Sequence, residues 1–174
     1  MLPAATDPRQ AREGRRSLPP GRSVEIQRLI GRALRAVLDL NSLPDLTIQI
    51  DCDVLDADGS TRAAAITGAY VALSEAIAHA MERGELPCNP LVGQVAAISV
   101  GLVEGIPMVD LTYEEDSRAS FDATVVMTRD GRLVEVQGTA EAGPITRQAF
   151  DSLLDLAATR MEELFETQDS AFKS

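Results

Sequence analysis

The sequence predicts an α/β protein of the α+β type, in which a mixed sheet with β-hairpins packs against helices. Apolar residues recur at helical spacing in the long segments and alternate or cluster in short runs elsewhere. The later runs pair off across turns of two or three residues, which are too short for the crossover that joins parallel strands. The expected order is helix, strand, helix, four strands in two hairpins and helix, which excludes a doubly wound parallel sheet.

The length of 174 residues suggests one domain, which we expect to span 23–167. Residues 1–22 contain four of the nine prolines, many arginines and few apolar residues, so they are expected to form an arm or loop. Residues 168–174 are polar and are expected to form a frayed tail.

The first helix is predicted to begin at Ser23, which is a suitable capping residue, and to end before Pro44. Residues 47–54 then alternate between apolar and polar side chains, and this alternation predicts a half-buried strand. A second helix is predicted over 61–83, because its apolar residues form one stripe and Gly84 is a natural stop.

The second half of the chain predicts two hairpins and a last helix. The predicted strands are 95–103, 108–111, 121–128 and 133–138. A Glu-Gly turn closes the first hairpin and an Arg-Asp-Gly turn closes the second. The acidic stretch 113–117 between the hairpins is expected to be a loop, and Thr146 can cap the final helix.

Composition excludes several classes of protein. The Gly-rich motifs that cradle nucleotides are absent from the sequence. The lone histidine, His79, lies within a predicted helix, and Cys52 and Cys88 are too few for a disulfide framework, so neither a catalytic triad nor a His-rich metal site is expected. There is no secretory signal and no apolar run long enough to span a membrane, so we expect a cytoplasmic protein with no membrane partner.

Charge is unevenly distributed along the chain. The net charge is −11, but residues 1–35 hold eight arginines against three acidic residues. Such asymmetry is typical of a basic arm that meets a polyanion. The alternative is a tail whose charge only aids solubility, and charge alone does not decide between the two.

Gly59, Ser60, Thr61 and Arg62 stand at the predicted start of the second helix. Free N–H groups and the helix dipole attract an anion there, and the guanidinium group of Arg62 suits phosphate. Gly59 lets the backbone approach closely. The alternative is an ordinary capped helix with Ser60 or Thr61 as the cap and Arg62 on the surface, and the local pattern by itself favours this alternative.

A second candidate site is an acidic cluster. Its carboxylates are Asp110, Glu114, Glu115, Asp116 and Asp122. Clustered carboxylates repel unless a cation neutralises them, and their oxygens suit Mg²⁺, which completes its shell with water and substrate phosphate. By itself, a solvated acidic loop is the simpler explanation. An Arg-rich arm, an anion site and a carboxylate pair together are nevertheless what phosphoryl chemistry on a nucleic acid needs.

Four stretches carry a more specific signal: GRSVEIQRLIGRALRAVLDL, IDCDVLDADGSTRAAAITGAYVAL, VDLTYEEDSRASFD and VEVQGTAEAGP. In this order they resemble ribonuclease PH, a family related to polynucleotide phosphorylase and to the exosome ring subunits. The resemblance runs from Met1 to about residue 168. It implies a ribosomal protein S5 domain 2-like fold and a homo-oligomeric, hexameric ring built as a trimer of dimers.

The resemblance also implies an activity. Members of this family are phosphate-dependent 3′→5′ exoribonucleases, also called tRNA nucleotidyltransferases, which trim the 3′ ends of tRNA precursors. Inorganic phosphate attacks the last phosphodiester of the RNA and releases a nucleoside diphosphate, and Mg²⁺ is the implied cofactor. The alternative within the family is a non-catalytic RNA-binding ring subunit or an inactive short form.

The resemblance assigns roles to three groups of residues. The implied phosphate-binding residues are Arg22, Gly59, Ser60, Thr61 and Arg62. The implied catalytic and metal-binding residues are Asp116 and Asp122. The implied RNA-binding residues are Arg9 and Arg12.

Several positions depart from the family pattern. The family usually has Gly where Ser60 stands and Arg where Ala4 stands, and it usually has D-M-N where Asp122 is followed by Ala123 and Thr124. The change at Ser60 bears on the tightness of the phosphate loop, and the others bear on RNA affinity. Family chains also carry a strand-rich segment before the Met-Leu-Pro with which this sequence starts, so we expect this chain alone to be impaired in folding, ring assembly or turnover.

Overall fold

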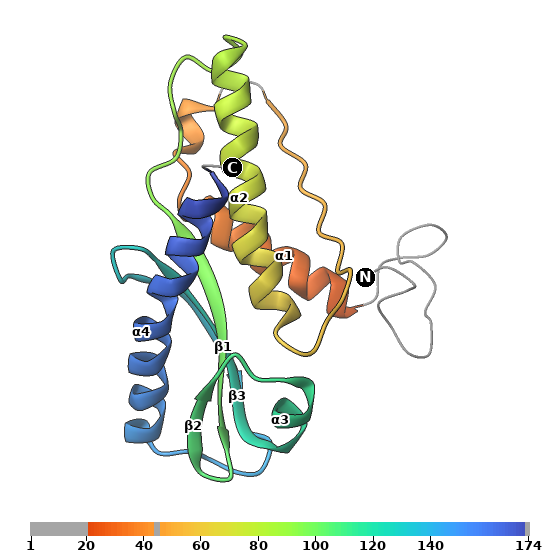
Figure 1. Ribbon diagram of the computed structural model, residues 1–174, viewed down its shortest axis with the longest axis vertical. Coiled ribbons are helices and arrows are strands. Elements are labelled where there is room, and N and C mark those ends of the chain that lie inside the picture. The colour runs from red at the N-terminus through yellow and green to blue at the C-terminus, as the bar shows by residue number, and fades with distance from the viewer. Residues whose placement is uncertain (1–20, 44–45, 173–174) are drawn as a thin grey trace.

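A computed structural model describes residues 21–43 and 46–172 (Figure 1). The helices are α1 (Gly21–Arg35), a 3₁₀-helix (Leu40–Ser42), α2 (Thr61–Glu82), α3 (Tyr113–Arg118) and α4 (Arg147–Ala171). The strands are β1 (Val95–Val103), β2 (Ile106–Val109), β3 (Ala119–Thr128) and β4 (Leu133–Thr139). The expected α+β class is confirmed, as are both hairpins and the long helices around them.

The four strands form one sheet in the order β2-β1-β3-β4. Every pairing in this sheet is antiparallel, so the sheet that was expected to be mixed contains no parallel pair in the described part of the chain. The turn between β1 and β2 contains Glu104 and Gly105, with φ angles of 52° and 78°. Two successive positive φ angles are typical of the type I′ turn, whose twist matches that of the flanking strands.

Helices cover both faces of the sheet. The helices α1 and α2 pack on the face that includes Ala97 and Val126. The helix α4 packs on the opposite face, which includes Ile98 and Val125. Because side chains alternate across a strand, Asp122 lies on the same face of β3 as Val126. The sheet therefore presents Asp122 towards the side occupied by α1 and α2.

Residues 47–54 do not form the predicted strand. The segment runs beside α2 as extended backbone (Figure 1), but residues 46–52 make no backbone–backbone hydrogen bond with other described residues. Ile50 and Cys52 pack against the core between α1 and α2, whereas Ile48 is 39% exposed. The alternation correctly indicated an extended backbone with an inward apolar face. The alternation gave no information about a partner strand, and among the described residues this segment has none.

Two other boundaries differ from the prediction. The helix α1 begins at Gly21, so the last two residues of the expected arm belong to it, and it ends at Arg35. The acidic stretch 113–117 is not a loop but forms most of α3. Thr112 and Glu115 form a capping box at its start. The backbone N–H of Thr112 donates to Glu115 Oε2 at 2.9 Å, and the backbone N–H of Glu115 donates to Thr112 Oγ1 at 3.3 Å. The T-x-x-E pattern for this box is present in the sequence.

The expected polar tail begins inside α4, which continues to Ala171. Gln168 is only 1% exposed. Its side-chain amide donates to the carbonyl oxygens of Thr67 and Val95, at 2.9 and 3.1 Å, and it accepts a bond from Gln94 Nε2 at 2.9 Å. Gln168 therefore joins α4 to α2 and β1. The assignment of 168–171 to a frayed tail was wrong, because residue type alone did not reveal these partners.

The helix α2 is long and apolar. Among the described helices it is the one that could cross a membrane by length and composition, but a single such helix is weak support, since a core helix of a soluble domain passes the same test. Ile66, Leu73 and Ile77 of α2 are buried against α1 and the sheet. Its apolar composition is thus explained by packing.

Candidate active site

The predicted phosphate loop is held against the segment that precedes α3. Gly59 has a φ of +91°, and a Cβ atom at this position would lie 2.3 Å from the carbonyl oxygen of Leu111. Only glycine fits such an approach. Ser60 also has a positive φ, 49°, and its Oγ lies 2.6 Å from Ser99 Oγ on β1 and 3.3 Å from Leu111 O. These contacts fix the start of α2 against the sheet.

Ser60 occupies the N-cap position of α2, but its side chain makes no capping hydrogen bond. The hydroxyl group is instead engaged with Ser99 and Leu111. The ordinary cap considered from the sequence is therefore not formed by Ser60. The first N–H groups of α2 receive no cap from this residue, which leaves the start of the helix suited to an anion.

Arg62 is paired rather than freely exposed. Its Nε and Nη2 atoms donate to Glu25 Oε2 of α1 at 3.2 and 3.0 Å. The two side chains are 35% and 32% exposed. Sequence reasoning had not placed Glu25 in the site. The available signal was its position three residues after Arg22, because residues at this spacing on a helix are neighbours.

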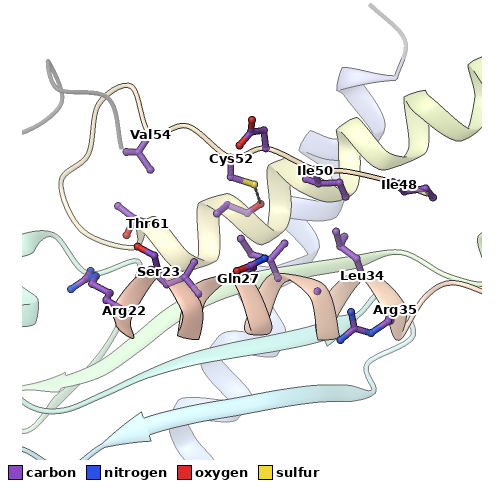
Figure 2. Close-up of a pocket in the computed structure, with 15 residues that line it drawn as sticks. Arg22, Ser23, Gln27, Leu34, Arg35, Ile48, Ile50, Cys52, Val54 and Thr61 are labelled. Atoms are coloured by element: carbon purple, nitrogen blue, oxygen red, sulfur yellow. Dashed lines mark hydrogen bonds between the residues drawn. The ribbon is translucent and has the colours of Figure 1, made fainter. Parts of the chain in front are cut away.

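Arg22 and Thr61 line the same end of a cleft of about 550 Å³ (Figure 2). The helix α1 forms one side of the cleft, and residues 48–54 form the other. The middle of the lining is largely apolar and includes Ile26 and Ile30, and Arg35 lies at the opposite end. Arg22 and the start of α2 therefore lie at one polar end of the cleft.

The two predicted aspartates come from different elements. Asp116 lies in α3, and Asp122 lies in β3 opposite Gly101 of β1. Burial raises the pKa of Asp122 above its ordinary value of 3.8, the negative charges of Asp116 and Glu141 raise it further, and Arg62 opposes them. Asp122 thus shares one electrostatic environment with Asp116 and Arg62, although the three are distant in the sequence.

Glu141 is a carboxylate that sequence reasoning did not single out. Its backbone N–H donates to Ser120 O at 3.0 Å, which holds the chain after β4 beside the start of β3. Its charge contributes to the raised pKa of Asp122. The position of Glu141 depends on the pairing of β3 with β4, so no local pattern would have identified it.

Asp116 and Asp122 alone would supply only part of the coordination shell of a metal ion. Among the residues that the structure describes, no group of three or more His, Cys, Asp or Glu side chains could hold a metal ion. Asp116 and Asp122 supply hard oxygen donors, and Mg²⁺ commonly takes one or two carboxylates and completes its shell with water and phosphate. The repulsion that helps to raise the pKa of Asp122 is what a bound cation would relieve.

Glu115 and His79, which were also considered from the sequence, have other partners in the structure. Arg9 and Arg12 lie outside the described residues. Glu115 completes the capping box of α3. His79 is exposed on α2, where its Nδ1 atom lies 4.0 Å from Glu82 Oε2.

Comparisons with known proteins define the class of the chain. Residues 1–78 match the model of the 3′ exoribonuclease family, domain 1, and residues 93–160 match domain 2 of the same family. The chain therefore belongs to the 3′ exoribonuclease family. The resemblance to ribonuclease PH drawn from the sequence motifs is confirmed.

Solved structures share the fold. The chain is similar to rice (Oryza sativa) Rrp46, with 16% identity and a TM-score of 0.68, over 91% of this chain and 69% of that one. It is also similar to a chain of the Archaeoglobus fulgidus exosome with RNA bound to the active site, with 24% identity and a TM-score of 0.70, over 96% of this chain and 67% of that one. This chain thus spans about two thirds of the length of each.

Proposed function

We propose that the protein is a phosphate-dependent 3′→5′ exoribonuclease that trims the 3′ ends of tRNA precursors and releases nucleoside diphosphates. The observation that carries the proposal is the contact of the loop at Gly59 and Ser60 with Leu111, which brings the start of α2, with Arg62, beside the segment that leads into α3, with Asp116. The raised pKa of Asp122, which Asp116 raises and Arg62 lowers, agrees with this arrangement. An arginine cation can bind a phosphate group while a neighbouring pair of carboxylates binds a metal ion. Membership of the 3′ exoribonuclease family supports this reaction class.

In the proposed mechanism, inorganic phosphate is the nucleophile and no side-chain nucleophile is needed. Arg22, Arg62 and the start of α2 would hold the phosphate in line with the scissile bond, which lowers the entropic part of the barrier. Thr61 stands at the first position of α2 and shares one end of the cleft with Arg22. Gly59 and Ser60 would act by fixing the loop that presents these groups.

Asp116 and Asp122 would hold a Mg²⁺ ion, which when bound stabilises charge on the attacked phosphoryl group and the leaving 3′ oxygen. Asp122 must be ionised to do so. Burial disfavours its charged form, and the positive charge of Arg62 counteracts this effect. Arg62 would thus serve both the phosphate and the carboxylate.

The remaining proposals concern assembly and location. RNA would be the macromolecular partner, with Arg9 and Arg12 contacting it. The protein would act in the cytoplasm as a hexameric ring, a trimer of dimers. The fold that it shares with an exosome chain solved with RNA at the active site supports a ring assembly that binds RNA.

A non-catalytic RNA-binding ring subunit is the alternative, and the ion pair between Arg62 and Glu25 is compatible with it. The carboxylate lowers the net positive charge that Arg62 offers to a phosphate, although one edge of the guanidinium group stays unpaired among the described residues. Ala4 and Thr124 stand where the family pattern differs, in agreement with this alternative.

One experiment separates the two functions. The protein is incubated with a 3′-extended tRNA, Mg²⁺ and inorganic phosphate, and nucleoside diphosphates are measured by chromatography. Their release only when phosphate is present supports the enzyme. Binding of the RNA without any product, with or without phosphate, supports the non-catalytic subunit, and light scattering on the same sample reports whether a hexamer forms.

A further inference from the structure

We propose that Glu25 is a positioning residue that holds one edge of the Arg62 guanidinium group so that the opposite edge faces the bound phosphate. This inference rests on the proposed function, because it takes Arg62 as a phosphate ligand. Glu25 would not touch the phosphate itself.

The geometry of the pair leaves half of the guanidinium group free. A guanidinium group carries five N–H donors in a rigid plane, and these form two usable edges. The edge made by Nε and Nη2 is occupied by Glu25 Oε2, at 3.2 and 3.0 Å. The edge made by Nη1 and the second hydrogen of Nη2 has no hydrogen-bond partner among the described residues. Such an edge matches two oxygens of a phosphate group.

The pair is not arranged as an ion pair that mainly stabilises the fold. Both bonds go to Oε2, and Oε1 of Glu25 is buried without a hydrogen-bond partner in the described part of the chain. A buried acceptor without a partner is unfavourable. The same helix carries a contrasting pair, in which Nε and Nη2 of Arg32 bond to both oxygens of Glu135. The pairing of Glu25 is thus better explained by its effect on Arg62.

The position of Glu25 suits this role. It lies one helical turn after Arg22, so α1 carries a candidate phosphate ligand and the residue that orients a second one. Arg62 is the second residue of α2, directly after the loop that Gly59 and Ser60 fix against Leu111. Its backbone is therefore set by the loop, and its long side chain is restrained by Glu25.

The test measures phosphate affinity in the full chain with Glu25→Gln. We expect the KM for inorganic phosphate in phosphorolysis to rise about tenfold, because a charge-assisted contact that fixes Arg62 is weakened. Asp151→Asn is the matched control, since it disrupts the ion pair with Arg147 on α4, at the opposite face of the sheet, and it should leave this KM unchanged. Thermal unfolding of each variant checks the fold.

A double-mutant cycle tests whether Glu25 acts through Arg62. Arg62→Ala should raise the KM for phosphate, and adding Glu25→Gln to it should cause no further rise. Arg62→Lys retains the charge but not the second edge, so it should weaken phosphate binding nearly as much as Arg62→Ala, even if the Glu25 variants fail to fold. An unchanged or lower KM in Glu25→Gln, independent effects in the double mutant, or normal binding by Arg62→Lys would each overturn the proposal.

Titration with inorganic phosphate alone, followed by ³¹P NMR, separates this inference from the proposed function. Weaker binding by Glu25→Gln in a protein that releases no nucleoside diphosphate supports the positioning role and rejects the enzyme. Equal phosphate affinity in the variant and in an active wild type rejects the positioning role alone. A wild type that binds no phosphate rejects both.

Discussion

Ser60 Oγ lies 2.6 Å from Ser99 Oγ and ties the first turn of α2 to the central strand β1. Ser60 adopts this position with a φ of 49°, a region that glycine enters without strain. The family usually has glycine here, so serine accepts a strained backbone and gains hydrogen bonds to β1 and to Leu111. This exchange gives a physical basis for a tightened phosphate loop.

The balance between backbone strain and hydrogen bonding at Ser60 can be measured with two variants. Ser60→Ala keeps the positive φ and loses the hydrogen bonds, so it should lower the free energy of unfolding by about 1–2 kcal/mol. Ser60→Gly loses the same bonds but relieves about 1 kcal/mol of backbone strain, so it should be the more stable variant. Urea unfolding of both proteins tests this order. A Ser60→Ala protein at least as stable as Ser60→Gly would contradict it.

Gly59 is expected to tolerate no side chain. In Gly59→Ala the new Cβ would lie 2.3 Å from Leu111 O at a φ of +91°, so strain and overlap add. We expect a loss of about 3 kcal/mol or more in the free energy of unfolding. Gly105→Ala is the matched control, since its φ is +78° but nothing lies within 4 Å of the new Cβ. It should cost only about 1 kcal/mol. Equal losses would show that strain alone matters at Gly59.

Asp122 is expected to be essential for turnover. Asp122→Asn keeps the size of the side chain but removes a charged oxygen ligand, and kcat should fall about a hundredfold or more. The measurement is the rate of nucleoside diphosphate release at saturating phosphate and Mg²⁺. Asp155→Asn, an exposed change on α4 at the other face of the sheet, should leave the rate unchanged. A rate near that of the wild type in Asp122→Asn would mean that the metal ligands are misassigned.

Gln168 should contribute strongly to stability. Gln168→Ala removes the donor to Thr67 O and Val95 O and leaves a small cavity, so the free energy of unfolding should fall by about 2–4 kcal/mol. Gln148→Ala, at an exposed position of the same helix, should change it by less than about 0.5 kcal/mol. Urea unfolding distinguishes the two, and a neutral Gln168→Ala would restore the idea of a frayed tail.

Asp130 should make stability depend on pH. Hydrogen bonds from Arg132 and from the Thr128 hydroxyl hold the pKa of Asp130 below its ordinary value of 3.8. Because the folded-state pKa is depressed, the ionised carboxylate stabilises the protein above the ordinary pKa, and this contribution is lost as the pH falls through the lowered value. Asp130→Asn should therefore be less stable than the wild type at neutral pH and equally stable in strong acid. A difference that persists in acid would instead reflect a change in the turn.

Much of the fold followed from periodicity, because helices and hairpins are local. The stripe of α2 and the turn at Glu104 and Gly105 are set by neighbours in the chain. The failures concern partners that are distant in sequence. Residues 47–54 have the pattern of a strand but no described strand beside them, and Gln168 is polar but buried by α2 and β1.

The residues of the candidate site also fall into two groups, those marked by local motifs and those placed by tertiary packing. Thr61, Arg62, Asp116 and Asp122 were proposed because motifs mark them, and their roles remain predictions. Glu141 stands out in no local pattern. Glu25 is marked only by its spacing from Arg22, and it becomes relevant only when α1 lies beside the start of α2. Tertiary packing places both near the motif residues.

The extended segment beside α2 has a consequence for exchange with solvent water. β1 pairs with β3 along its whole length and with β2 at its end, and β3 also pairs with β4, so amide hydrogens bonded in these ladders exchange only when the sheet opens. Residues 46–52 lack backbone hydrogen bonds to other described residues, so their amides should exchange almost as fast as those of an unfolded peptide. One wall of the 550 Å³ cleft is thus formed by a segment that shares no backbone hydrogen bond with the sheet that carries Asp122, among the residues that the structure describes.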